Sequence, residues 1–329
     1  MFDEELITWS IDGGGHSFHR SHHRFSVTNV CGYMRVDATQ VDCRFLASQL
    51  QNLHGAKSFD YQIKAHPSVI RGEYTIPLPP LPEQRTIASA LSDVDALLEG
   101  LTRLISKKRD LKQAAMQQLL TGQTRLPGFT GEWDARKLGS LGRFVKGSGV
   151  RKDEASSGSL PCIRYGEIYT VHNDVIREFR SFISREVAGH ALALQSGDLL
   201  FAGSGETKEE IGKCVAFVDS VEAYAGGDIV VLRPTSSVDS TFMGFLLNAP
   251  GIAKQKASKG QGDAVVHISA SSLADIETQL PELDEQQAIA EVLSEMDTEL
   301  SALEARREKT VALKQAVMQE LLTGRTRLV

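Results

Sequence analysis

Basic and polar side chains set among glycines are the residues of this 329-residue chain that are best suited to chemistry. Residues 146–152 read KGSGVRK, a Gly/Ser loop whose three cations could approach phosphate groups closely. An arginine at position 164 could lie against the edge of a guanine. The candidates for nucleic-acid contact in this half of the chain are Lys146, Ser148, Arg151, Lys152, Arg164, Tyr165, Lys254, Lys256, Lys259, Gln261 and His267. Those from Lys254 to His267 are expected in loops or turn-rich stretches. The alternative for each is an ordinary solvated side chain.

The densest basic cluster lies near the start of the chain, where residues 16–24 read HSFHRSHHR. Histidines at such short spacing resemble a metal site, but the segment contains no carboxylate or thiolate partner, so we expect no metal here. We predict a solvated turn. If the segment contacts phosphate, the candidate residues are His19, Arg20 and Arg24.

The sequence lacks the motifs that catalysis on nucleic acid would need. No (N/D)-P-P-(Y/F) tetrapeptide is present, which an adenine methyltransferase would carry. The glycines at 203 and 205 lack the rest of a nucleotide-binding fingerprint, and no Walker lysine follows them. Acidic residues with a nearby lysine, as in a nuclease, do not form a recognisable cluster. We therefore predict that the chain is not an enzyme and holds no cofactor.

An internal repeat provides the elements that must position these residues. Residues 81–126 and 283–328 align without a gap, and about half of their positions are identical. Both copies contain the pattern EQxxIAxxL near their start and LKQAxMQxLLTG near their end. One chain thus contains two versions of the same element.

Each copy has the features of a long helix. Apolar residues recur three and four positions apart, and Gly122 and Gly324 suit the left-handed position that ends a helix. At about 1.5 Å per residue, each helix would be on the order of 60 Å long. A helix of that length needs a partner, and the other copy is the natural one, so we predict a two-helix coiled coil.

Two acidic–amide pairs open the helices, and they have alternative interpretations. Glu83 and Gln84 recur as Glu285 and Gln286. Such residues could satisfy free N–H groups at a helix start. Their repetition favours a shared role, either in packing a domain against the helix or in docking a partner protein, and we favour packing.

The two stretches that precede the helices read as β-rich. In the first, the expected strands are Leu6–Ile11, Phe25–Val30 and Tyr74–Leu78, with a short helix at Phe45–Leu53. In the second, the expected strands are Phe144–Val145, Cys162–Tyr165, Asp198–Phe201, Cys214–Val218 and Ile229–Leu232. The two stretches resemble each other, but nothing in the first matches residues from about 136 to 195. The expected segments are 1–80, 81–123, 124–280 and 281–329, in an α+β fold.

Composition narrows the class of protein. The net charge of -6 argues mildly against a general nucleic-acid coat protein but permits a locally basic groove. No apolar run approaches membrane-spanning length, so we expect no membrane contact. Four scattered cysteines without CxxC spacing fit reduced thiols in a cytoplasmic protein.

Repeated helices that open with P-x-x-x-E-Q-x-x-I-A-x-x-L, each preceded by a β-rich domain, resemble the DNA specificity subunits of type I restriction–modification enzymes. The resemblance covers nearly the whole chain. It rests on the EQxxIAxxL openings, the LKQAxMQxLLTG closings and the entry Trp133-x-x-x-x-Leu138 into the second domain.

The resemblance implies two target-recognition domains joined by two long antiparallel coiled-coil helices. Each domain would read one half of a bipartite site on double-stranded DNA, and the helices would set the spacing. The helices would also dock type I methyltransferase subunits, two of them in the expected assembly, and these partners would bind S-adenosylmethionine. A separate restriction subunit would cut the DNA.

The chain departs from the family pattern in its first domain, which has about half of the expected length. The first 80 residues are therefore predicted to form a partial target-recognition domain. Two alternatives to full target reading follow. The chain could be a regulatory specificity subunit that docks methyltransferase without reading the whole target, or a coiled-coil scaffold that does not contact DNA.

Overall fold

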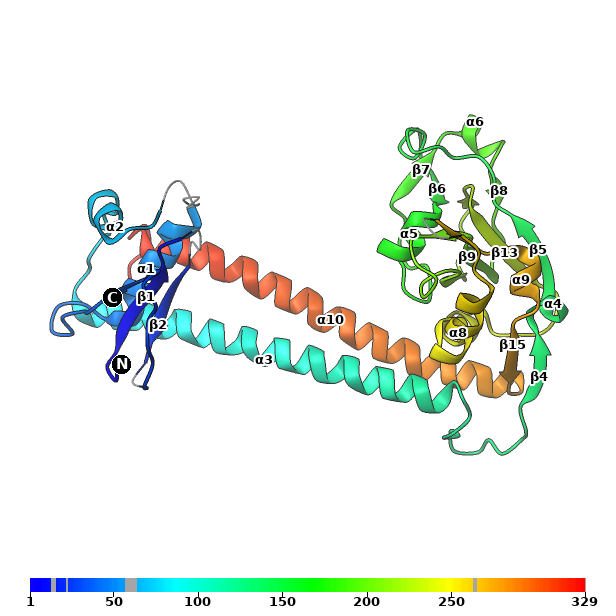
Figure 1. Ribbon diagram of the computed structural model, residues 1–329, viewed down its shortest axis with the longest axis horizontal. Helices are drawn as coiled ribbons and strands as arrows, with labels where there is room; N and C mark the ends of the chain where they lie inside the picture. Colours follow the sequence, from blue (N-terminus) through cyan, green and yellow to red (C-terminus); the bar gives the residue numbers. More distant parts are fainter. Residues whose placement is uncertain (13–15, 22, 57–63, 263–264, 329) are drawn as a thin grey trace. The chain divides into compact units, whose positions relative to one another are not determined.

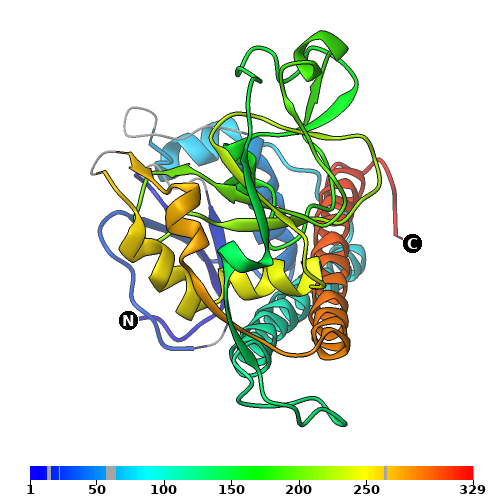
Figure 2. The ribbon, with the colours of Figure 1, turned by 90° about the vertical axis from the view of Figure 1, so that its right-hand side faces the viewer.

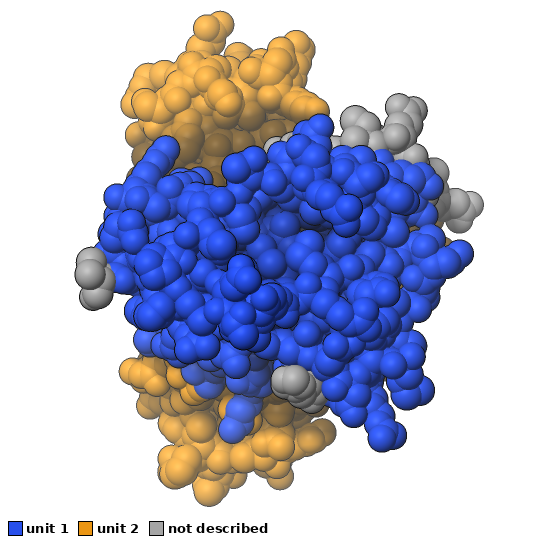
Figure 3. Space-filling view, turned by 90° about the vertical axis from the view of Figure 1, so that its left-hand side faces the viewer, with its two compact units in different colours: residues 1–107, 300–329 blue, residues 108–299 orange. Residues whose placement is uncertain are grey.

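The computed structural model of the chain describes residues 1–12, 16–21, 23–56, 64–262 and 265–328. These residues form two compact units, which Figure 3 distinguishes by colour. The first unit contains residues 1–107 and 300–329, and the second unit contains residues 108–299. Each unit combines a β-rich portion of the chain with parts of both long helices.

Two long helices, α3 (Leu81–Leu119) and α10 (Leu283–Leu322), form where the repeated sequences predict them (Figure 1). Gly122 and Gly324 have φ values of 68° and 72°, which confirms the left-handed residue expected after each helix. None of the described helices is long and apolar enough to span a membrane.

Within each unit the two helices run antiparallel. In the first unit, the beginning of α3 lies beside the end of α10, where Asp95 pairs with Lys314 at 2.5 Å. In the second unit, the end of α3 lies beside the beginning of α10, where Lys112 pairs with Asp297 at 2.5 Å. The two pairs use the same repeat positions, so the repeated sequence explains why both units contain the same contact.

A three-stranded antiparallel sheet forms the β-rich part of the first unit. It contains β1 (Leu6–Ser10), β2 (Ser17–Arg20) and β3 (Cys31–Met34) in the order β2-β1-β3. Helices α1 (Cys43–Ala56) and α2 (Pro67–Glu73) follow. Their apolar residues pack on the sheet around Trp9, whose indole Nε1 donates to the Ala65 carbonyl at 2.8 Å.

Three expectations for this unit are wrong. The basic segment is no solvated turn, because residues 17–20 pair with β1 as the strand β2. The expected strand Phe25–Val30 reduces to one bridge between Phe25 and Phe2. Tyr74–Leu78 is extended but pairs with no described strand. Its sequence suits a strand, but a strand requires a neighbour for its backbone groups.

The second unit is built around the four-stranded sheet β11-β9-β13-β5 (Figure 2). Its strands are β5 (Gly142–Lys146), β9 (Asp198–Ala202), β11 (Cys214–Phe217) and β13 (Ile229–Pro234). Side chains from β9, β11 and β13 are almost fully buried, which explains their continuous apolar sequences. The strands expected at these positions are confirmed.

Smaller elements complete the second unit. A second sheet has the order β7-β6-β12-β8, and β10 pairs with β14 and β15 with β4. These elements are β4 (Asp134–Lys137), α4 (Leu138–Leu141), β6 (Leu160–Ile163), α5 (Tyr165–Thr170), β7 (Ser181–Ile183), α6 (Arg185–Ala188), β8 (Leu192–Ala193), β10 (Ser204–Gly205), β12 (Tyr224–Ala225), α7 (Ser240–Asn248), α8 (Pro250–Lys259), β14 (Val266–His267), α9 (Ala270–Ala274) and β15 (Glu277–Leu280). The strand expected at Cys162–Tyr165 ends at Ile163, because the next residue caps α5.

The two units contain the same three-stranded core in the same register. In the first unit Ile7 lies opposite Met34, and in the second unit Leu199 lies opposite Leu232. The third strand repeats this agreement, because Ser17 lies opposite Trp9 as Cys214 lies opposite Phe201. The resemblance between the β-rich stretches is therefore structural. Among the residues that the structure describes, only those of the second unit add a fourth strand, β5, to this sheet.

Candidate nucleic-acid interface

Several loops of the second unit lie at one end of its four-stranded sheet. Strands β5 and β9 end there, whereas β11 and β13 begin there, because each strand runs antiparallel to its neighbours. The loops involved are residues 146–152, 203–205 and 226–228. We refer to these three segments together as the glycine-loop face.

Backbone hydrogen bonds hold the three loops of the glycine-loop face together. The Gly147 amide donates to the Ile229 carbonyl at 2.8 Å, and the Gly227 amide donates to the Gly149 carbonyl at 3.1 Å. The amide of Gly203 donates to the Asp228 carbonyl at 2.7 Å. Position 147 requires glycine, because a Cβ added there would lie 2.1 Å from the carbonyl oxygen of Gly226.

One of these fixed loops, residues 146–152, contains exposed cations. Lys146, Arg151 and Lys152 are all exposed, as the sequence-based interpretation requires. Ser148 is exposed as well, but its hydroxyl donates to the His190 carbonyl at 2.7 Å. The predicted loop 146–152 thus offers three cationic side chains on a backbone that neighbouring loops hold in place.

Arg164 and Tyr165 adjoin the glycine-loop face at the start of α5. The Gly226 amide donates to the carbonyl of Ile163, directly before Arg164. Arg164 is half-buried, and its backbone amide donates to Glu167 Oε2 at 3.0 Å, which fixes the start of the helix. Tyr165 is 41% exposed. The structure thus places this pair beside the predicted basic loop.

A polar group around His267 adjoins the same face. His267 Nδ1 lies 2.9 Å from Ser204 Oγ, and backbone hydrogen bonds connect His267 with Gln261. The Ile268 amide donates to the Gly203 carbonyl at 3.0 Å, which joins this group to the glycine loops. Gln261 and His267 are both exposed, so their predicted positions are compatible with contact to a ligand.

The sequence-based interpretation missed two parts of this site. Tyr169 donates from its hydroxyl to the Ser204 carbonyl at 3.1 Å, and burial raises its pKa to about 12, so it stays a neutral donor. Residues 226–228 connect the other loops and were not singled out. The paired glycines directly before an apolar strand were the available signal for this segment.

The prediction for the three lysines near residue 256 needs correction. Lys254, Lys256 and Lys259 lie on helix α8 and not in a loop. Lys254 is exposed and Lys259 is half-buried, but Lys256 is only 2% exposed. Its Nζ donates to the Gly212 carbonyl at 2.6 Å, and burial lowers its pKa to about 8. Lys256 therefore anchors the loop before β11 and is too buried to contact phosphate.

The basic candidates of the first unit are largely engaged within the chain. His19 Nε2 lies 2.7 Å from Glu5 Oε1. Arg20 donates from Nε to Thr8 Oγ1 at 3.0 Å, and its guanidinium lies over the ring of Phe18. Arg24 is exposed, and its Nε lies 3.8 Å from Asp3 Oδ2. Of the three, Arg24 has the most freedom to meet a ligand.

His19 also belongs to a group with metal-ligand chemistry. The possible ligand atoms of Glu5, His19 and Cys43 all lie within 4.8 Å of one another. The carboxylate and thiol that residues 16–24 lack thus come from other elements of the fold. Burial is the main cause that raises the pKa of Cys43 to about 12, so its thiol is protonated at neutral pH. A metal would have to displace this proton, and the absence of a metal stays a prediction.

Comparison with known proteins decides the family. Residues 2–107 and 130–313 match the model of the Type I restriction modification DNA specificity domain. The chain belongs to this family. The match covers the β-rich portions of both units and most of both long helices, as the resemblance had suggested.

Two relatives of this specificity-domain chain come from an archaeon. The Type I restriction enzyme MjaVIII specificity subunit of Methanocaldococcus jannaschii is 25% identical over 267 residues, covering 77% of this chain and 62% of the relative. The putative MjaX specificity subunit of the same organism is 26% identical over 276 residues, covering 77% of this chain and 59% of the relative. The chain thus spans less than two thirds of the length of either relative.

A solved structure has the same fold. The Type-I restriction-modification system S subunit from M. genitalium superimposes with a TM-score of 0.66 at 16% sequence identity. The match covers 98% of this chain and 84% of the other. It supports the α+β arrangement of β-rich domains and long helices.

The repeated helix openings of this specificity-domain chain attach each β-rich portion to its own helix. Gln84 Oε1 accepts from the Asp42 amide at 2.9 Å, and Gln286 Oε1 accepts from the Asp239 amide at 3.0 Å. Both glutamines are buried. These contacts are those of domain-to-helix packing, the interpretation that we favoured, and they leave the glutamines little surface for a partner protein.

The glutamates next to these glutamines form ion pairs with arginines that follow the end of the other long helix. In the first unit Glu83 pairs with Arg327 at 2.6 Å, and in the second unit Glu285 pairs with Arg125 at 2.5 Å. Each arginine follows the glycine that ends the other repeat, so the two pairs are equivalent. Glu285 is only 2% exposed, and it too is unsuited to docking a partner.

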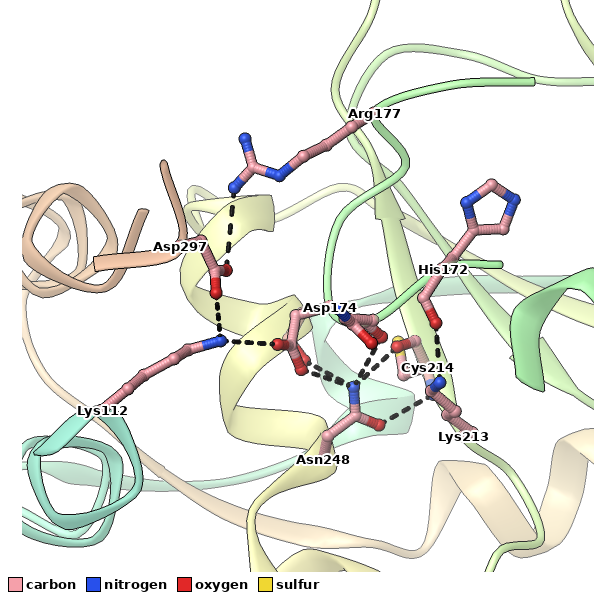
Figure 4. A network of polar contacts seen from close by, with 10 residues as sticks. Lys112, His172, Asp174, Arg177, Lys213, Cys214, Asn248 and Asp297 are labelled. Carbon is pink, nitrogen blue, oxygen red and sulfur yellow. Dashed lines mark hydrogen bonds and ion pairs between the residues drawn. The ribbon is translucent and has the colours of Figure 1, made fainter. Parts of the chain in front are cut away.

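A polar network fixes the β-rich part of the second unit on its helices (Figure 4). Lys112 of α3 lies 2.5 Å from Asp297 of α10 and 3.5 Å from Asp174. The Asn248 amide nitrogen donates to Asp174 Oδ1 at 3.0 Å and to the Cys214 carbonyl at 2.8 Å. The network thus connects both helices with β11, which begins at the glycine-loop face.

Proposed function

We propose that this chain is the DNA specificity subunit of a type I restriction–modification enzyme and binds double-stranded DNA without catalysing a reaction. The observation that carries the proposal is the glycine-loop face with its exposed Lys146, Arg151 and Lys152. Exposed cations suit phosphate contact, and the nearby Arg164 and Gln261 have side chains suited to base edges. Family membership supports the same role.

The chemistry would belong to partner subunits in the cytoplasm. We infer that two methyltransferase subunits dock on the helix pair and bind S-adenosylmethionine, and that a restriction subunit joins them. The repeated sequences of residues 81–126 and 283–328 support this inference, because two copies of one helix offer two similar surfaces. The chain itself would need no cofactor.

A second candidate is a regulatory specificity subunit that occupies methyltransferase subunits without reading a complete target. One observation favours it, which is that the three-stranded sheet of the first unit has no counterpart of β5 among the described residues. On this account the second unit would still recognise one half-site.

Duplex binding at several salt concentrations tests the proposal. The full chain, in complex with its methyltransferase subunits, would be titrated with labelled duplexes selected from a random library. We expect the double variant Arg151→Ala/Lys152→Ala to reduce the slope of log affinity against log salt by about two, because each lost phosphate contact contributes about one.

The matched control is Arg136→Ala/Lys137→Ala. These two exposed cations lie on β4, before the opposite end of β5. They should leave both affinity and slope unchanged. A complex that binds no duplex would favour the scaffold alternative, and equal effects of the two double variants would contradict the proposed face.

A further inference from the structure

Three side chains with metal-ligand chemistry meet in the first unit. Glu5 lies directly before β1, His19 lies on β2, and Cys43 is the first residue of α1. Their ligand atoms are a carboxylate oxygen, an imidazole nitrogen and a thiol sulfur, and all lie within 4.8 Å of one another. Within the group, His19 Nε2 lies 2.7 Å from Glu5 Oε1. Because the three residues come from separate elements, only the folded unit brings them together.

The register of the sheet directs His19 towards the start of α1. His19 lies opposite Ile7 of β1, whose side chain is buried in the core between the sheet and the helices. Side chains directly opposite each other point to the same face of a sheet. Two residues earlier on β2, Ser17 Oγ donates to the Ala47 carbonyl of α1 at 3.1 Å. The face that carries His19 therefore packs on the helix that begins with Cys43.

Burial and charge of this group suit one divalent cation. Cys43 is 6% exposed, whereas the side chains of His19 and Glu5 are 25% and 33% exposed. The sulfur thus closes the inner side of the group, and the outer side is open to an entering ion. A thiolate, a carboxylate and a neutral imidazole together carry two negative charges, which one divalent cation balances. The complex therefore buries no net charge.

The second unit shows what the same three positions contain in the other copy of the core. The shared strand register fixes the equivalents of Glu5 and His19. Helices α1 and α7 begin alike, because the residue before each helix, Asp42 or Asp239, accepts from the amide three residues further on. This agreement fixes the equivalent of Cys43. The equivalents of Glu5, His19 and Cys43 are Gly197, Ala216 and Ser240.

The junction between the helix start and the strand start thus has different chemistry in the two units. In the second unit a direct hydrogen bond joins the two elements, because Ser240 Oγ donates to the Gly197 carbonyl at 2.8 Å. In the first unit a thiol and a carboxylate occupy these positions, with an imidazole in place of the methyl group of Ala216. The shared core forms without these ligand types, so the ligand set is a feature of the first unit alone.

We propose that Glu5, His19 and Cys43 bind one zinc ion, which stabilises the first unit by joining the start of β1, strand β2 and the start of α1. Imidazole, carboxylate and thiolate are the ligands that zinc takes in proteins. Tetrahedral zinc, with bonds of about 2.0–2.3 Å, separates its ligand atoms by roughly 3.3–3.6 Å. The Glu5–His19 contact would therefore open slightly, the thiol proton would pass to solvent, and a water molecule would complete the tetrahedron.

The proposal replaces the expectation of no metal, which rested on residues 16–24 alone. That segment contains only one of the three ligands, and the carboxylate and the thiol come from other elements. The ion would be structural and would take no part in catalysis. The zinc site does not depend on the proposed function, so its failure would leave the glycine-loop face unaffected.

Titration of the full chain with Co²⁺ tests the site. Tetrahedral cobalt absorbs strongly in the visible range, and a cobalt–thiolate bond adds a charge-transfer band in the near ultraviolet. We expect one equivalent of Co²⁺ to bind and one equivalent of Zn²⁺ to displace it. Cys43→Ser should abolish the charge-transfer band, and His19→Ala and Glu5→Gln should each weaken binding at least tenfold. Serine and alanine occupy the equivalent positions of the second unit, so the first two variants should fold.

Two control variants separate this site from other binding. Cys31→Ser removes the other cysteine of the first unit, and His23→Ala removes an exposed histidine of the basic segment. Both should retain one tightly bound Co²⁺ with an unchanged spectrum. Zn²⁺ should also raise the Tm of the wild-type chain but not that of Cys43→Ser, because only an ion held by all three elements stabilises their packing.

Three results would overturn the proposal. The first is no binding of Co²⁺ or Zn²⁺ by the wild-type chain. The second is a charge-transfer band that persists in Cys43→Ser, which would assign the thiolate to another cysteine. The third is loss of binding in His23→Ala with none in His19→Ala, which would show adventitious binding by surface histidines.

Discussion

At the scale of single residues, two lysines on helix α8 have different surroundings although they lie two positions apart. Lys254 is exposed, whereas Lys256 is buried and donates to the Gly212 carbonyl. Both occur in the same short sequence, PGIAKQKASK, which gives no signal of which lysine faces inward. The sequence therefore singled out both lysines as candidates, but it predicted neither their helix nor the burial of Lys256.

This difference leads to a prediction about duplex binding. Lys254→Ala should weaken binding and reduce the salt slope by about one, as expected for one lost phosphate contact. Lys256→Met should leave the salt slope unchanged, and thermal unfolding should reveal its structural role. A change of salt slope in Lys256→Met with no change in Lys254→Ala would contradict this assignment.

The pH dependence of stability provides a second test of Lys256. Burial lowers the pKa of this lysine to about 8 from 10.5. Between these pH values the unfolded chain holds a proton that the folded chain has lost, so this group's contribution to stability rises with pH. We expect the free energy of unfolding of wild type, relative to Lys256→Met, to increase from pH 8 to pH 10.

Urea denaturation at several pH values measures this difference. Tyr169, whose pKa burial raises to about 12, acts in the opposite direction, but it is present in both proteins and its contribution cancels. A difference between the two proteins that is constant or falls over this range would contradict the burial of the Lys256 ammonium.

At the scale of elements, the repeated helices differ in how deeply they bury equivalent contacts. Lys112 has a side chain that is 13% exposed and lies between Asp297 and Asp174. Its repeat equivalent, Lys314, pairs with Asp95, whose side chain is 51% exposed. Both lysines lie in the same repeated sequence, LKQA. Only the packing of the β-rich part of the second unit distinguishes their surroundings.

Substitution of the two lysines should therefore have unequal effects. Lys112→Met leaves two partly buried carboxylates without their shared cation and should lower the free energy of unfolding by about 2–3 kcal/mol. Lys314→Met removes a more exposed pair and should cost less than about 1 kcal/mol. Chemical denaturation of the full chain measures both values. Equal losses in the free energy of unfolding would show that the Lys112 network stabilises the fold no more than the Lys314–Asp95 pair.

The elements also show which parts of the fold the sequence determines locally. The long helices and their ends were predictable because periodicity, repetition and the glycines at 122 and 324 agree. Strand β2 was missed because the surrounding histidine- and arginine-rich sequence reads as a polar turn. Residues 74–78 were mistaken for a strand because a ladder depends on a neighbour, which local sequence cannot supply.

At the scale of the whole molecule, the candidate DNA-binding residues are distributed unequally between the two units. The described residues form two units, and each unit has its own copy of the same three-stranded core. The glycine-loop face lies entirely in the second unit. Its position could not be read from sequence alone, because residues 146–152, 203–205 and 226–228 meet only through the antiparallel strand order. The candidate cations were identifiable in sequence, but the backbone that holds them was not.

Methylome sequencing of cells that carry this chain and its cognate methyltransferase subunit tests the central claim most directly. We predict an adenine-methylated motif with a fixed half-site that Arg164→Ala or Gln261→Ala relaxes, whereas Arg24→Ala leaves that half-site unchanged. A motif that is insensitive to both substitutions in the second unit but changes with Arg24→Ala would contradict recognition through the glycine-loop face.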